Sequence, residues 1–192
     1  MTSRTTIPLP LRANRVHEAC GAGRVGFAVA AMALVRRTLW IRESWQGETL
    51  NPLGLSDFCD PSQLLVAQTK DQTDMLAVAE EALRDGALPL VVLEITRPLN
   101  LREGRRLQLA AKAGKSIGLC LLPEGMGSNA SETRWLCTPL FDPDDSTLMS
   151  WEIIKNKSGT NGTWHVRWNA AARRFDVVCP AGKRPGSAGA AL

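Results

Sequence analysis

The segment GAGRVGFA, residues 21–28, has the glycine spacing of a phosphate-binding loop but lacks the side chains that carry out its chemistry. In the pattern G-x-x-x-x-G-K-[ST], the lysine contacts phosphate oxygens and the hydroxyl group ligates Mg²⁺. Gly21 and Gly26 supply the two glycines, yet Phe27 and Ala28 occupy the positions of the lysine and the hydroxyl. The segment therefore predicts a structural turn followed by a core helix, and no ATP hydrolysis.

An alternative keeps this loop active, with Arg24 in place of the missing lysine and Gly23 allowing a tight turn. Backbone N–H groups at the start of a helix attract anions even without a lysine. Such a site would also need an acid to position Mg²⁺ or water, and Glu94 is placed like a Walker B acid at the end of an apolar run. A single carboxylate there is more often a solvated or capping group. We therefore expect no catalytic residue, no cofactor and no metal.

A second chemical feature is a cluster of cations within a predicted helix that begins at Asn100, with Glu103 in capping-box position, and ends at Gly114. Helical spacing puts the cations around one face and Leu107 and Ala111 on the opposite face. Plain solvation is one interpretation, and weak, sequence-independent contact with DNA phosphates or with an acidic partner is the other. The residues of this basic face are Arg102, Arg105, Arg106 and Lys112.

The remaining reactive side chains match no known catalytic or metal-binding pattern. His17 and His165 are far apart, and the five cysteines are scattered without a C-x-x-C pair. This pattern argues against a zinc site, a disulfide framework and a Cys-His nucleophile, and it favours reduced thiols in a cytoplasm. Trp45 lies in a polar stretch without an obvious core partner, so it is a candidate exposed interface anchor.

Length and composition predict one soluble domain. A chain of 192 residues that is 44% hydrophobic can bury a substantial core. Its longest apolar run, residues 27–35, is shorter than the ~20 residues that a membrane helix needs. The net charge of +4 is compatible with nucleic acid or an acidic partner. We predict a flexible arm at 1–15, a domain at 16–179 and a disordered tail, rich in Gly, Ala and Pro, at 180–192.

Apolar runs and helix caps predict strands that alternate with helices. A helix is expected over 27–37, and another is capped by Thr73 or Asp74 and stopped by Gly86. This order indicates an α/β domain with a mostly parallel β-sheet flanked by helices. In the last third, the alternation in 163–168 indicates an antiparallel β-meander at the C-terminal end. The predicted strands are 16–20, 38–41, 64–68, 88–95, 117–122, 151–155, 163–168 and 175–178.

Several of these segments resemble RecA recombinases and, more narrowly, the ImuA family of bacterial SOS-mutagenesis accessory proteins. The segments that are similar to RecA are HEACGAGRVGFAV (17–29), the stretch from LLVAQ to VVLEI (64–95) and WEIIKNKSG (151–159). Those that are similar to ImuA are LWIRESW (39–45), LPLVVLE (88–94), RRLQLAA (105–111), ETRW (132–135) and IKNKSGTNGTW (154–164). They follow one another in the same order over residues 16–178, and no single one is convincing alone.

The resemblance implies a truncated RecA-like core with a degenerate P-loop. It implies a non-catalytic adaptor in SOS-induced translesion synthesis that contacts an ImuB-type Y-family polymerase homologue and RecA, with no membrane partner. It places Glu43 near the water-activating acid of RecA, and it matches Lys155 and Lys157 to two lysines that a RecA protomer extends into its neighbour's ATP site. Two alternatives stay open: an ATPase that uses Arg24, and an inhibitor of cell division of the SulA type.

Overall fold

The structure is a computed structural model that describes residues 11–180. The first ten residues of the predicted arm and residues 181–192 of the predicted tail lie outside the described residues. Residues 11–15 lie against the domain, since the Asn14 N–H donates a hydrogen bond to the Ser116 carbonyl at 3.1 Å. No helix within residues 11–180 is long and apolar enough to cross a membrane.

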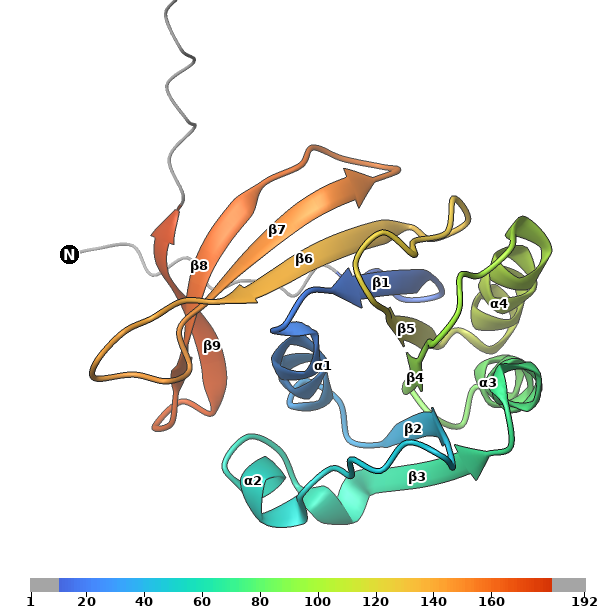
Figure 1. Cartoon of the computed structure of the whole chain (residues 1–192), viewed down its shortest axis with the longest axis horizontal. Helices are drawn as coiled ribbons and strands as arrows, with labels where there is room; N and C mark the ends of the chain where they lie inside the picture. The colour runs from blue at the N-terminus through green and yellow to red at the C-terminus, as the bar shows by residue number, and fades with distance from the viewer. Residues whose placement is uncertain (1–10, 181–192) are drawn as a thin grey trace, which may run out of the picture.

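The described chain forms one mixed sheet of nine strands, in the order β3-β2-β4-β5-β1-β6-β7-β8-β9 (Figure 1). Neighbours from β3 to β6 are parallel, and neighbours from β6 to β9 are antiparallel. The predicted α/β fold, with a parallel core and a C-terminal antiparallel meander, is confirmed. The strands are β1 (Val16–Cys20), β2 (Thr38–Glu43), β3 (Leu64–Thr69), β4 (Leu90–Glu94), β5 (Ile117–Leu121), β6 (Thr133–Pro139), β7 (Met149–Asn156), β8 (Thr163–Asn169) and β9 (Arg174–Pro180).

Helices cover both faces of the parallel part of the sheet. One face packs against α1 and α2, and the other packs against α3 and α4. The predicted capping box of Asn100 and Glu103 at the start of α4 is confirmed. The N-cap of α3 is Asp71 rather than Thr73 or Asp74, because the Asp71 carboxylate accepts hydrogen bonds from the backbone N–H groups of both. The helices are α1 (Arg24–Met32), α2 (Pro52–Ser56), η1 (Pro61–Gln63), α3 (Gln72–Asp85) and α4 (Leu101–Gly114).

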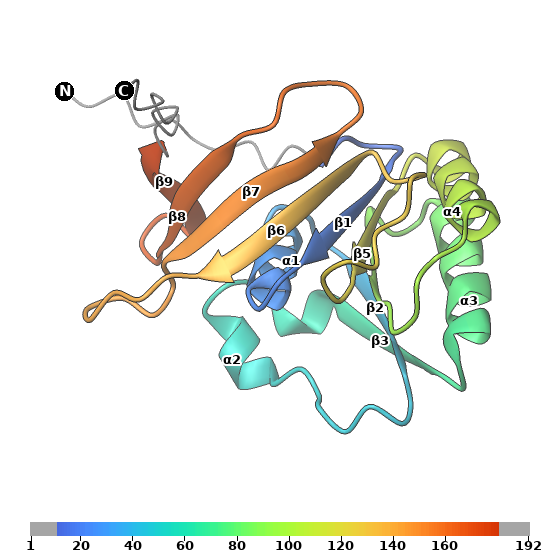
Figure 2. The same cartoon turned by 45° about the horizontal axis from the view of Figure 1, so that its top comes forward.

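The α1 helix lies at the centre of the molecule. Figures 1 and 2 show the meander continuing the sheet beyond β1 and curving over α1. The helix is thus enclosed on two sides, and residues 27–32 are all buried. The predicted helix over 27–37 was wrong at both ends, since α1 spans Arg24–Met32. It stops there because residues 33–37 form the turn that leads into β2.

The strand that joins the parallel part to the meander, β6, was not predicted. Thr133, Trp135 and Cys137 alternate toward the core, but Arg134 interrupts the apolar pattern. Its side chain forms an ion pair with the buried Glu18 of β1, with Arg134 Nε 2.8 Å from Glu18 Oε2. The charged residue is therefore compatible with a central strand, although its partner lies far away in the sequence.

Candidate functional site

The turn between β1 and α1 is too short to wrap a phosphate group. The helix begins at Arg24, three positions before Phe27, so that residues 24–26 are helical. Only Gly21, Ala22 and Gly23 remain outside regular structure. The Arg24 guanidinium folds back, with Nη1 donating a hydrogen bond to the Gly21 carbonyl at 3.2 Å. The predicted structural turn followed by a core helix is what this segment forms.

Contacts with the meander account for the three glycines. Gly21 has φ +85°, and a Cβ atom there would lie 2.5 Å from the Cys137 carbonyl oxygen. A Cβ on Gly23 would lie 3.1 Å from the same oxygen, and one on Gly26 would lie 3.0 Å from the Met149 side chain. The Gly23 N–H donates a hydrogen bond to the Cys137 carbonyl at 2.8 Å. In a phosphate-binding loop, backbone N–H groups of this kind point at the phosphate instead. The phosphate-loop glycine spacing serves close packing here.

Phe27 fills the position of the missing lysine with a core side chain. The ring is fully buried, and its centroid lies 5.1 Å from that of Trp135 and 4.9 Å from that of Trp151. These distances are typical of favourable aromatic pairs. Ala28 is also fully buried. Neither side chain reaches solvent at the edge of the sheet where a nucleotide would lie.

A pocket of about 410 Å³ opens at this edge, beside the carboxyl ends of β2, β4 and β5. In open parallel sheets this is where ligands usually bind. Arg24, Arg42, Glu94 and Trp45 line it together with residues of the loop after β2. Trp45 is 67% exposed, as expected for a candidate interface anchor. With Glu48 also in the lining, the pocket combines two cations, two carboxylates and an exposed indole.

Glu94 and Glu43, the two acids that the sequence singled out near this edge, are held by the chain's own side chains. Glu94 Oε1 accepts a hydrogen bond from Trp40 Nε1 at 2.5 Å, and Glu94 Oε2 lies 3.6 Å from Arg42 Nη2. Glu43 Oε2 accepts a hydrogen bond from the Thr96 hydroxyl at 2.7 Å. Within residues 11–180, no group of three His, Cys, Asp or Glu side chains could hold a metal ion. Both acids therefore have a structural environment that accounts for them.

Sequence reasoning missed Arg42, although its signal is present. In TLWIRE, strand alternation puts Arg42 on the same face as Thr38 and Trp40, which is the face that α1 covers. The Arg42 side chain is only 5% exposed, and its Nε has no hydrogen-bond partner among the described residues. A cation on the inner face of a strand is the pattern that could have identified it.

The predicted trans-acting lysines contact their own chain. Lys155 Nζ donates hydrogen bonds to the carbonyls of Ser128 and Ser131 at 2.8 and 3.0 Å, and Lys157 Nζ donates to the Ala130 carbonyl at 2.8 Å. Burial lowers the pKa of the Lys155 ammonium below its ordinary value. A role for the two lysines in a neighbouring protomer stays a prediction. It would require the Lys155 ammonium, whose three N–H donors all have acceptors in this chain, to leave them.

Glu18, the acid that precedes the turn, completes this buried network. It is 1% exposed. Its carboxylate accepts hydrogen bonds from the Ser128 N–H and the Ser131 hydroxyl at 2.8 and 2.9 Å, besides the ion pair with Arg134. Charge-assisted contacts of this kind hold the loop before β6 against β1. Glu18 thus positions the same loop that the two lysines contact.

The predicted basic face divides into two parts. Arg106 turns toward α3, where its Nη2 lies 2.6 Å from Glu80 Oε2. Arg105 and Lys112 instead line an open pocket of about 450 Å³ together with Arg15 and Lys157. The structure thus brings Lys157 close to two residues of the basic face, which the sequence could not show. Arg102 is exposed on the outer side of α4 and has no ion pair within residues 11–180.

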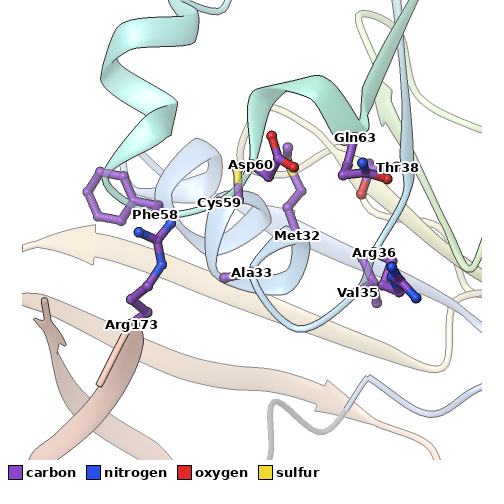
Figure 3. A pocket seen from close by; sticks show the side chains of 10 residues that line it. All are labelled: Met32, Ala33, Val35, Arg36, Thr38, Phe58, Cys59, Asp60, Gln63 and Arg173. Atoms are coloured by element: carbon purple, nitrogen blue, oxygen red, sulfur yellow. The ribbon is translucent and has the colours of Figure 1, made fainter. Parts of the chain in front are cut away.

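A further pocket of about 340 Å³ lies at the opposite edge of the sheet, between the end of α1 and the β8–β9 turn (Figure 3). Figure 3 shows Arg173 extending from that turn toward Phe58. Cys59 lies on the wall, and burial raises the pKa of its thiol, so it is not an activated nucleophile. Burial also raises the thiol pKa of Cys20, Cys120 and Cys137.

Comparisons with known proteins give no independent assignment. No protein-family model matches the chain, and no curated protein has a matching sequence.

Proposed function

We propose that this protein is a non-catalytic adaptor in SOS-induced translesion DNA synthesis, a role of the ImuA type. The observation that carries the non-catalytic part is the position of Phe27. Its buried ring packs between two tryptophans where the phosphate-binding lysine would stand. The pathway is supported by the order of the resembling segments along residues 16–178. On this proposal the partners are an ImuB-type Y-family polymerase homologue and RecA.

The side chains around the carboxyl edge of the sheet support a binding role better than a catalytic one. Glu94 and Glu43 accept hydrogen bonds from Trp40 and Thr96, respectively. In the turn after β1, the Gly23 N–H donates a hydrogen bond to a carbonyl of β6. A fold held in this way has no need of a nucleotide to order it. It leaves exposed surfaces such as Trp45 and α4 for contacts with other proteins.

The test is genetic complementation of a strain that lacks the chain, with damage-induced mutation as the readout. In the strain that lacks the chain, we expect the frequency of ultraviolet-induced mutants to fall to the level of unirradiated cells. We expect wild type and Arg24→Ala to restore it equally, because no step needs a cation at a phosphate. Failure of a stably folded Arg24→Ala protein, together with Mg²⁺-dependent ATP hydrolysis by wild type, would favour the ATPase. Filamentous cells on overexpression with unchanged mutation frequency on deletion would favour the division inhibitor.

A further inference from the structure

The outer face of α4 carries exposed leucines and unpaired cations in one stripe. Leu101, Arg105, Leu109 and Lys112 follow one another at helical spacing and all line the 450 Å³ pocket. Leu101 is 49% exposed and Leu109 is 68% exposed. Arg105 and Lys112 have no ion pair within residues 11–180, so their charges are available to a partner.

The opposite wall of the pocket adds two more cations. Arg15 comes from the segment before β1, and Lys157 directly follows β7. Glu132 is the carboxylate that lines the pocket, and it is already engaged by Arg15 at 3.6 Å and by the Ser158 hydroxyl at 2.6 Å. Arg15 pairs with Glu132, so three of the four cations have no carboxylate partner among the described residues, and the pocket favours an anionic ligand.

The wall is rigid where α4 meets the sheet. The Gln108 side chain donates hydrogen bonds to the carbonyls of Val16 and Ala130, both at 3.0 Å, and accepts one from the Val16 N–H at 3.2 Å. These bonds fix α4 relative to β1 and to the loop before β6, whose Ala130 carbonyl also accepts a hydrogen bond from Lys157. A ligand would meet cations whose separation is set by the fold, so little ordering is needed on binding.

We propose that this surface binds an acidic amphipathic helix of a partner protein, with the helix lying along α4. Carboxylates of the partner would contact Arg105, Lys112 and Lys157, and its apolar residues would cover Leu101 and Leu109. The leucines decide between ligand classes, because DNA phosphates need the cations but gain nothing from two exposed aliphatic side chains. From Leu101 to Lys112 the stripe extends for about 16 Å, which three turns of a partner helix would span. The surface is argued from charge and exposure alone, so it does not depend on the mutagenesis role proposed above.

The experiment measures binding of the full chain to a labelled synthetic peptide by fluorescence anisotropy. The probe is a helix of about 15 residues with Leu on one face and Glu beside it, and a scrambled peptide of equal composition is its control. Oligothymidine of about 15 nucleotides is the competing ligand. We expect the amphipathic peptide to bind at least about tenfold more tightly than either of the others.

Two double variants locate the surface. Arg105→Glu with Lys112→Glu should weaken peptide binding at least about tenfold, and Leu101→Ser with Leu109→Ser at least about fivefold. Arg37→Glu with Lys70→Glu makes the same change in charge at exposed positions elsewhere and should change affinity less than about twofold. Equal losses in that control, no preference over the scrambled peptide, or tighter binding of oligothymidine would each overturn the proposal.

Discussion

Replacing Phe27 by Lys restores the residue that a phosphate loop needs, and we expect it to unfold the protein rather than create an ATP site. Loss of a buried Phe typically costs ~3–5 kcal/mol. Full burial and ring contacts with Trp135 and Trp151 at 5.1 and 4.9 Å place Phe27 at the upper end of this range. A lysine ammonium in the same space adds a desolvation penalty on the order of several kcal/mol, because the position is fully buried among aromatic rings. The total approaches the ~5–15 kcal/mol that stabilises a typical domain.

The assay for this substitution is urea unfolding followed by tryptophan fluorescence, with calorimetric titration of Mg-ATP on each folded variant. Phe27→Leu is the matched control, because it keeps an apolar side chain and should cost only about 1.5 kcal/mol. We expect Phe27→Lys, alone or with Ala28→Thr, to be largely unfolded without urea and to bind no ATP. A Phe27→Lys protein with the wild-type urea midpoint and measurable Mg-ATP affinity would refute the argument that the ring anchors α1.

Three further outcomes follow from residues around the turn and its supporting loop. Gly21→Ala should destabilise the fold by at least about 2 kcal/mol in urea unfolding, because alanine is unfavourable in a left-handed backbone conformation and its Cβ would meet the Cys137 carbonyl. Its control is Gly47→Ala, which has open space around it and should change stability by less than ~0.5 kcal/mol. Glu18→Gln should lower the free energy of unfolding by ~3–5 kcal/mol, because Arg134 loses its buried carboxylate partner. The exposed Glu81→Gln should lower it by under ~0.5 kcal/mol in the same assay, and equal effects would contradict the buried network. Burial lowers the pKa of His17 to about 4, so the unfolded chain takes up a proton at higher pH than the folded protein does. Stability should therefore fall by up to ~3 kcal/mol as the pH drops from 6.5 toward 4, and a His17→Gln protein should lack this part of the pH dependence.

Local signals predicted most of the elements. The capping box at Asn100 and the glycine stop after α3 depend on neighbouring residues, and both lie where the sequence placed them. The early start of α1 had no such signal. Residues 24–26 are free to be helical because β6 accepts the Gly23 N–H, and this contact joins residues more than a hundred positions apart. A contact between remote residues also explains why β6 was not predicted. Arg134 interrupts its apolar pattern, and the partner that makes this charge compatible with the sheet, Glu18, is more than a hundred positions away.

Most residues of the candidate site were predictable, with Arg42 as the exception, but their grouping was not. Phe27 and Ala28 indicated a loop without lysine or hydroxyl, and the structure gives both a place in the core. The basic face was assigned to α4 as one unit, but Glu80 of α3 draws Arg106 away from it. The gathering of Lys157 with Arg105 depends on α4 packing against β1 and on β6 lying between β1 and β7 in the sheet. No spacing along the chain carries that information.

The central place of β1 also governs the order in which the chain can fold. Although β1 comes first among the described strands, its neighbours are β5 and β6, with Val16 opposite Gly118 and Glu18 opposite Arg134. During synthesis from the N-terminus, β1 must therefore wait for about a hundred residues before it acquires β5 and β6, and Phe27 of α1 must wait for more than a hundred before Trp135 and Trp151 are made. A ribosome paused within α4 would hold a nascent chain in which α1 still lacks its contacts with β6 and β7, and such an intermediate is prone to aggregate or to bind a chaperone.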